Sequence, residues 1–278
     1  MSAARIIWSD VLDRAAEIVA GYSTGVTLRQ LHYRLVAAQV IPNTPSAYKT
    51  LSARTAEARR AGWFPALVDR TRTIRRPAYA DDPLSEIEWL AQTYRRDRTE
   101  GQAQALYIGV EKNGMVAQLE SWFGDLGIPI LALGGYSSQT FCDDVARDVH
   151  RDGREATLIY AGDFDPSGED IQRDFGERTE FCFGEIDRVA LTAEQVVEHN
   201  LPPQMGKASD TRAAAFVAKY GELVQVELDA LPPDVLRRLY QEAIDAHWDR
   251  SKYAAVLDQE SQERELIERF RDEFEEAA

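Results

Sequence analysis

Strands and helices are expected to alternate through the middle of this chain, and this alternation limits the fold more than any other feature. Short apolar runs at 104–110, 128–133, 156–162 and 188–191 each precede a segment of helical periodicity. The runs are uninterrupted, which is typical of strands that are covered on both faces of a sheet. The pattern therefore predicts a parallel α/β domain at 105–200.

The segments on either side of this domain are expected to be mainly helical. Three helical patterns at 9–21, 27–39 and 46–63 come before an arginine-rich β-segment at 64–77. This is the order of a winged helix-turn-helix, a DNA-binding fold. We therefore expect three further parts: a winged-helix domain at 1–80, a connecting helix and linker at 81–104, and a C-terminal extension of a strand and helices with an acidic helical end at 201–278.

The net charge of −15 hides a difference between the two parts of the chain. Residues 1–98 hold 15 Lys and Arg against 10 Asp and Glu, whereas residues 99–278 hold 17 against 37. Such asymmetry points to a portion that binds nucleic acid. We expect contacts with the phosphates of double-stranded DNA from a cluster of basic residues: Lys49, Arg54, Arg59, Arg60, Arg70, Arg72, Arg75 and Arg76. The alternative is a solvated helix followed by a charged loop.

Several classes of protein do not fit the sequence. No apolar run is long enough for a transmembrane helix, and the N-terminus does not have a signal-peptide core. The two cysteines form no CxxC pair, and the four histidines are scattered without ligand spacing. We therefore expect a cytoplasmic protein with reduced thiols, without a disulfide framework or a zinc site.

Acidic side chains follow two of the expected strands. Glu111 follows the run at 104–110, and Asp163 and Asp165 follow the run at 156–162. In a parallel sheet, ligands bind beyond the carboxyl ends of the strands, and residues two apart in extended chain point the same way. Carboxylate oxygens in this number suit Mg²⁺. The sequence therefore predicts a metal site formed by these three residues.

An acidic turn at a helix N-terminus is the alternative, because Asp, Ser and Glu are favoured there without any metal. The stretch Asp163–Asp170 holds four carboxylates in eight residues. For Glu169 and Asp170 we prefer the helix-start interpretation. Glu169 would at most contact the metal ligands and not the metal itself.

The two acidic motifs together resemble the Toprim domain, the metal-binding fold of topoisomerases, primases and related nucleases. GVEKNG contains the strand-terminal glutamate, here Glu111. GDFDPSGEDI resembles the DxDPxG form that is typical of the A subunit of type IIB DNA topoisomerases and of the related meiotic double-strand-break transesterase. The resemblance covers about residues 104–190. It implies a Rossmann-like domain in which Glu111, Asp163 and Asp165 hold Mg²⁺, with Mn²⁺ as an alternative.

The resemblance also implies a nucleophilic tyrosine, and the second helical pattern holds a candidate; the alternative is a surface tyrosine that makes one hydrogen bond. The family places its catalytic tyrosine after a motif of the form R-[DE]-aliphatic-aromatic-Tyr, and TLRQLHYRL puts Arg29 and Tyr33 at its arginine and tyrosine. Gln30 replaces the usual acid and His32 the usual aromatic residue. At 100° per residue, Tyr33 lies about 140° from Leu28, away from the apolar stripe, and shares a face with Arg29. We expect it to be presented outward.

The resemblance implies DNA strand cleavage by Tyr33, with Arg29 stabilising charge, through a covalent phosphotyrosine link. It also implies a homodimer in which the tyrosine and the metal come from different subunits. No loop of the P-loop kind suggests an ATPase. The chain would therefore work with a separate ATPase subunit, or cleave DNA without strand-passage control.

Two other functions stay open at this point. The protein could be a hydrolytic Toprim nuclease that uses the metal site and not the tyrosine. It could also be a non-catalytic DNA-binding protein in which the Toprim-like domain is a scaffold.

Overall fold

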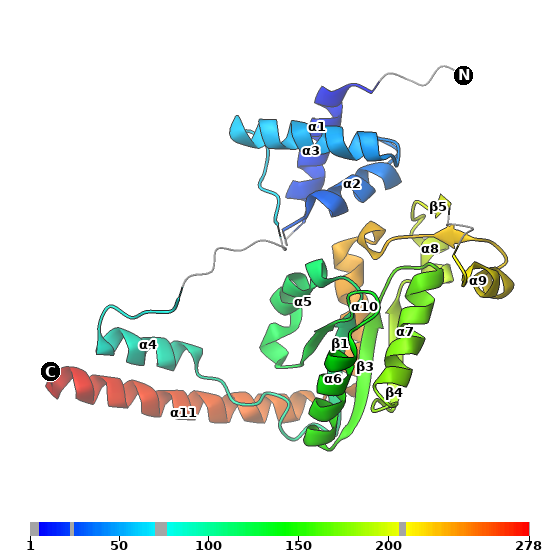
Figure 1. Ribbon diagram of the computed structural model, residues 1–278. Coiled ribbons are helices and arrows are strands. Elements are labelled where there is room, and N and C mark those ends of the chain that lie inside the picture. Colours follow the sequence, from blue (N-terminus) through cyan, green and yellow to red (C-terminus); the bar gives the residue numbers. More distant parts are fainter. Residues whose placement is uncertain (1–5, 23–24, 70–76, 206–209, 278) are drawn as a thin grey trace, which may run out of the picture.

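The structure is a computed structural model that describes residues 6–22, 25–69, 77–205 and 210–277. At its centre lies a four-stranded parallel sheet with the strand order β2-β1-β3-β4 (Figure 1). The strands are β1 (Gln104–Val110), β2 (Ile130–Ala132), β3 (Glu155–Ala161) and β4 (Glu185–Ala190). The predicted α/β class is confirmed, and each of the four expected strands is present with boundaries shifted by a few residues.

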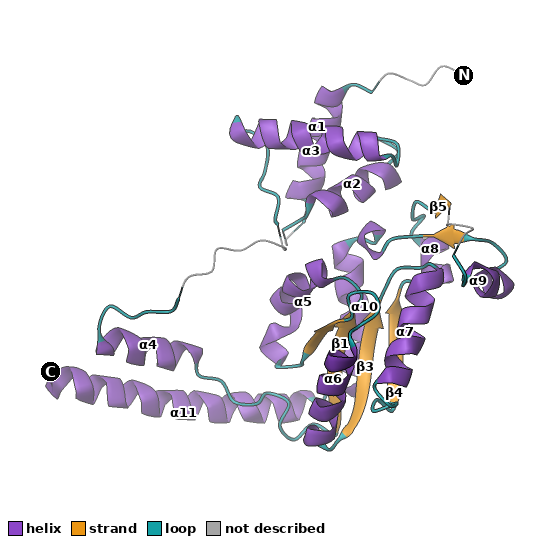
Figure 2. Cartoon of the chain, in the orientation of Figure 1, coloured by secondary structure: helices purple, strands orange, loops and turns teal. Residues whose placement is uncertain are grey.

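Helices cover both faces of this sheet (Figure 2). The covering helices are α5 (Val116–Phe123), α6 (Gln139–Asp152), α7 (Pro166–Arg178) and α10 (Pro233–His247). Ile108 and Ile159 face one core with α5 and α10, whereas Tyr107 and Leu158 face the other core with α6 and α7. Alternate residues of a strand point to opposite faces, so burial on both faces requires the uninterrupted apolar runs seen in the sequence.

The N-terminal part of the chain forms the helices α1 (Trp8–Ala20), α2 (Leu28–Ala37) and α3 (Pro45–Arg60). They share a separate core that includes Leu12, Leu31 and Leu51. Val68 forms an isolated bridge with Thr27. The rest of the expected wing, residues 70–76, lies outside the described part of the chain.

The C-terminal extension returns to the carboxyl edge of the sheet. After α8 (Ala193–Glu198), which still belongs to the central domain, the extension contains β5 (Gln204–Met205), α9 (Ala213–Tyr220), β6 (Val224–Gln225) and a 3₁₀ helix, η3 (Leu228–Ala230). The strand expected in this extension is present as the short β6, which pairs with β5 before the chain turns into η3. Val226 bridges Phe164, which brings the next residues, 227–229, beside the end of β3.

A long helical arm is formed by segments that are far apart in sequence. α4 (Pro83–Thr93) lies along α11 (Arg250–Ala277), and both extend away from the sheet in Figure 1. Near its base, Arg98 donates two hydrogen bonds to Glu260, at 2.7 and 3.1 Å. Glu260 is only 2% exposed and also accepts from the backbone of Arg96 and from Arg264. This carboxylate therefore ties the connecting segment to α11.

Across the described ranges, none of the helices combines the length and apolar character needed to cross a bilayer.

Glu260→Gln should lower the free energy of unfolding by about 2 kcal/mol at pH 7, because the half-buried arginines Arg98 and Arg264 lose their anionic partner. Hydrogen bonds from Arg98 bring the pKa of Glu260 down to about 2, against about 4.3 in an unfolded chain. The stabilisation is then complete above pH ~4.3 and disappears as the pH falls towards 2. Urea unfolding at several pH values measures this difference.

Glu265→Gln is the matched control, because Glu265 is an exposed residue of the same helix. It should leave stability unchanged. An equal loss in both variants would contradict the proposed tie.

Candidate metal and nucleophile site

The three predicted carboxylates meet at the carboxyl edge of the sheet. β1 and β3 are neighbours, and their register places Val110 opposite Ala161. Glu111 and Asp163 therefore leave the sheet side by side, and the backbone N–H of Asp163 donates to Oε2 of Glu111 at 2.8 Å. Asp163 and Asp165 are 6% and 9% exposed. The structure thus places Glu111 and Asp163 in contact, with Asp165 in the same turn.

The turn after β3 is fixed by short contacts that explain its sequence. Asp165 caps α7 by accepting from the backbone of Gly168 at 2.6 Å, and its other oxygen accepts from Gln225 at 3.0 Å. A Cβ at Gly168 would lie 2.2 Å from the carbonyl oxygen of Asp163, so this position requires glycine. Arg188 donates to the same carbonyl at 2.7 Å. Both aspartates are therefore held by the turn itself.

The next two acids, in the first turn of α7, have other partners. Glu169 pairs with Lys219 at 2.6 Å and accepts from Tyr220 at 3.0 Å. Asp170 accepts from Tyr136 and from Arg212. Their surroundings match the helix-start interpretation.

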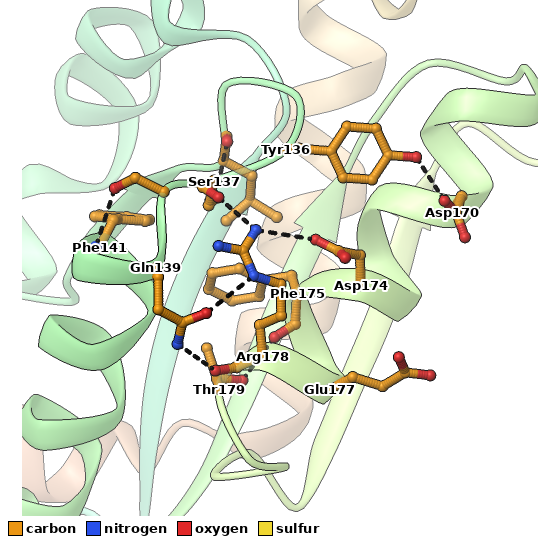
Figure 3. A network of polar contacts seen from close by, with 12 residues as sticks. Tyr136, Ser137, Gln139, Phe141, Asp170, Asp174, Phe175, Glu177, Arg178 and Thr179 are labelled. Carbon is orange, nitrogen blue, oxygen red and sulfur yellow. Dashed lines mark hydrogen bonds and ion pairs between the residues drawn. The ribbon is translucent and has the colours of Figure 1, made fainter.

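Figure 3 shows how α7 holds the loop after β2. Arg178 reaches from α7 to the carbonyl of Ser137 and to the side chain of Gln139, and Tyr136 points its hydroxyl at Asp170. Arg178 also pairs with Asp174 at 3.3 Å. The loop that begins with Gly134 is thereby fixed next to Glu111, whose backbone carbonyl accepts from the Gly134 N–H at 2.8 Å.

The structure adds three charged residues that the sequence reasoning missed. The ammonium of Lys112 lies 2.9 Å from Asp163 and 3.0 Å from Asp229, and it also contacts Glu227. The backbone N–H of Leu228 donates to the same oxygen of Asp163 at 2.7 Å. The sequence VELDA does repeat the pattern of an apolar run followed by two acids, so a signal existed. The position of residues 227–229 beside the end of β3 could not be predicted from this pattern.

Burial sets the protonation behaviour of this cluster. It raises the pKa of Asp163 to about 7, with a further increase from Glu111, although the ammonium of Lys112 acts against it. Burial also raises the pKa of Glu111. Burial acts on Glu227 in the same sense, but Lys112 and Arg29 outweigh it and bring its pKa below the usual value. Positive charge near Glu111 and Asp163 would therefore be strongly favourable.

The donor chemistry of this edge fits a hard divalent cation. Glu111, Asp163 and Asp165 offer carboxylate oxygens, which are the ligands of Mg²⁺ and Mn²⁺. Within the described ranges, however, no group of three or more Asp, Glu, His or Cys side chains is arranged so that it could hold a metal ion. One reason is visible in the geometry, because an ammonium already contacts Asp163.

The nucleophile candidate does not face solvent as expected. Tyr33 is 7% exposed and belongs to the core that lies between the sheet, α5 and α10. The helical-stripe argument failed because α2 is packed on two faces. Leu31 and Leu35 face α1 and α3, whereas Gln30 on another face donates to Gln118 of α5 at 3.0 Å.

Arg29 connects Tyr33 with the acidic cluster. Its guanidinium lies 5.9 Å from the centre of the Tyr33 ring. The same group pairs with Glu227 at 2.5 Å and with Asp229 at 3.2 Å. The predicted pairing of Arg29 with Tyr33 on one face of the helix is thus present, and the arginine also joins α2 to the C-terminal extension.

Two cavities flank Arg29. The larger, about 770 Å³, lies between α2, α3 and the carboxyl edge of the sheet, and its lining includes Arg59, Glu111 and Lys112. The smaller, about 360 Å³, is lined by Tyr33, His32 and Lys49 and by the start of α3. Both volumes are within the range of ligand sites.

Four of the eight predicted DNA-contacting residues can be placed. Lys49, Arg54, Arg59 and Arg60 are exposed on α3. Lys49 reaches the smaller cavity and Arg59 the larger one, whereas Arg54 is 3.9 Å from Glu57. The other four, Arg70, Arg72, Arg75 and Arg76, lie outside the described residues.

The comparisons with known proteins do not extend these observations: no protein-family model and no curated protein matches the chain.

Arg29→Met should loosen the contact between α2 and η3, because Glu227 and Asp229 lose a cation that comes from the N-terminal helices. Hydrogen–deuterium exchange should then be roughly fivefold faster at the amides of α2 and of residues 226–230. Arg14→Met, which removes an exposed ion pair of α1 with Glu17, is the control and should leave these rates unchanged. Equal rates in Arg29→Met and the unchanged protein would contradict the bridging role.

Proposed function

We propose that this protein cleaves strands of double-stranded DNA in a reaction that depends on Mg²⁺ or Mn²⁺. The observation that carries the proposal is the adjacency of Glu111 and Asp163 at the ends of neighbouring parallel strands, joined by a 2.8 Å hydrogen bond. Buried carboxylates with raised pKa values are characteristic of functional sites. We further propose that the fold is Toprim-like and that the N-terminal helices form a winged-helix unit.

The divalent cation, when bound, supplies positive charge that stabilises a phosphate and a leaving oxygen. Glu111, Asp163 and Asp165 are the residues that would hold it. Their positions follow from the paired strand ends and from the capped turn at Gly168, so the ligands are ordered before a substrate arrives.

Tyr33 is the nucleophile that we favour. Its ring lines the 360 Å³ cavity together with Arg29 and Lys49, two cations that suit a phosphate. In the reaction, the phenolic oxygen would bond to phosphorus and lose its proton to solvent. The bond between phosphorus and the 3′ oxygen of the DNA would break, and this oxygen would take up a proton from solvent and leave as a 3′ hydroxyl. The product is a 5′-phosphotyrosine link.

Hydrolysis is the second candidate, and the burial of Tyr33 favours it. At 7% exposure, the hydroxyl can reach DNA only if α2 changes its packing or if the phosphate enters the cavity. In hydrolysis, water activated at the carboxylate edge would be the nucleophile, and Glu111 lines the larger cavity.

The DNA would contact the exposed basic residues of α3. Lys49 lines the smaller cavity and Arg59 the larger one, and Arg29 lines both. Phosphate contacts of this kind fix the position of the duplex without reading its sequence. We propose a homodimer, with one cleavage site for each DNA strand, and a separate ATPase subunit where strand passage follows cleavage.

Supercoiled plasmid incubated with the protein and Mg²⁺ or Mn²⁺ tests the reaction. After quenching with SDS, transesterification should give DNA that enters the gel only after proteolysis. Glu111→Gln and Asp163→Asn should each lower cleavage at least 100-fold, because the cation loses a ligand. Tyr33→Phe should abolish the covalent link, and Tyr79→Phe, which changes a tyrosine that is 83% exposed, should keep it.

Free nicked or linear product that Tyr33→Phe also makes would establish hydrolysis instead. No cleavage by any preparation, with DNA binding intact, would leave the protein as a DNA-binding module.

Replacing Lys49, Arg54, Arg59 and Arg60 together by Ala should weaken binding to duplex DNA regardless of sequence. The dependence of log affinity on log salt should become shallower by up to about 3 to 4, because up to four phosphate contacts are lost. Fluorescence anisotropy at several salt concentrations measures this. A matched change of Arg237, Arg238, Arg250 and Arg269 to Ala should not alter the slope, and a similar effect of both sets would refute the α3 interface.

A further inference from the structure

The ammonium of Lys112 lies where a cation bound by Asp163 would be expected. It is 2.9 Å from Oδ1 of Asp163, one of the three predicted metal ligands, and it follows Glu111 directly in the chain. Its side chain is 20% exposed and its other two carboxylate partners, Glu227 and Asp229, come from the C-terminal extension. A buried carboxylate is costly without a positive neighbour, and Lys112 provides one.

From this geometry we propose that Lys112 is a resident counter-cation that competes with the divalent cation for Asp163, and so sets the affinity of the site. The inference rests on the proposed function in one respect, namely that Glu111, Asp163 and Asp165 bind such an ion. It assigns a role to a residue that the motif comparison did not include.

The partners of Lys112 explain how the exchange can occur without unfolding the edge. Glu227 and Asp229 are not among the predicted ligands, and both contact the ammonium. When Asp163 turns to the divalent cation, the lysine keeps these two carboxylates. Arg29 of α2 also pairs with both of them, so Glu227 and Asp229 stay in place while Asp163 changes its partner.

The competition is electrostatic, so its size follows from charge and distance. A unit positive charge a few ångströms from a divalent cation repels it, and the repulsion is large in a partly buried site. Removing the charge should therefore tighten divalent binding by at least about tenfold. Replacing lysine with arginine keeps the charge and should keep the affinity low.

Mn²⁺ binding to the whole protein, measured by titration calorimetry and by the loss of free-ion EPR signal, tests this without reference to cleavage. Lys112→Met should bind Mn²⁺ at least about tenfold more tightly than the unchanged protein, and Lys112→Arg should bind it about equally. Lys219→Met is the matched control. It removes a lysine that pairs with Glu169 at 2.6 Å, and should leave the affinity unchanged.

The double variant Lys112→Met with Glu227→Gln guards against a failure to fold. It removes one cation and one carboxylate together, so the charge balance of the cluster is kept. Compared with Glu227→Gln alone, it should again bind Mn²⁺ more tightly.

The outcomes separate the two proposals. The competition is overturned if Lys112→Met binds Mn²⁺ no more tightly than the unchanged protein and the double variant binds it no more tightly than Glu227→Gln alone. The proposed metal site is then retained. No Mn²⁺ binding by any of these proteins overturns both. Tight binding by Lys112→Met alone supports the competition most strongly.

Discussion

The cost of burying several carboxylates together is the constraint on which the architecture of this protein depends. Parallel pairing of β1 with β3 forces Glu111 and Asp163 into contact, and burial makes their charged forms expensive. The cost is offset by Lys112 and by backbone N–H groups from the turn and from Leu228. Residues 227–229 of the C-terminal extension and Arg29 of α2 therefore both lie at this edge of the sheet.

The acidic residues at this edge also explain why the N-terminal helices contact the central domain through α2. Arg29 lies between two environments, with the Tyr33 ring on one side and Glu227 on the other. An arginine suits this place because its planar fork can pair with two carboxylates while its face lies towards an aromatic ring. The tyrosine and the carboxylate cluster are thus physically connected through one side chain.

Much of the central domain could be predicted from the sequence, because its signals are local. Uninterrupted apolar runs identify the buried parallel strands, and acids directly after two of them identify the site edge. The positions of Glu227 and Asp229 could not be predicted in this way. They depend on the pairing of β6 with β5 and on the bridge from Val226 to Phe164, which are contacts between distant segments. The burial of Tyr33 was missed for the same reason, since a stripe shows one packed face of a helix and not a second one.

The Arg29–Glu227 ion pair joins residues that are 198 positions apart. The contacts from Lys112 to Glu227 and from Asp163 to Leu228 are also long in sequence, at 115 and 65 positions. Contacts of this kind form late, because large loops must close before them. During synthesis the N-terminal helices and the first strands emerge well before residue 227 exists. The charged edge can therefore be completed only when most of the chain has been made, and a chain that ends before residue 227 would lack the two carboxylates that pair with both Lys112 and Arg29.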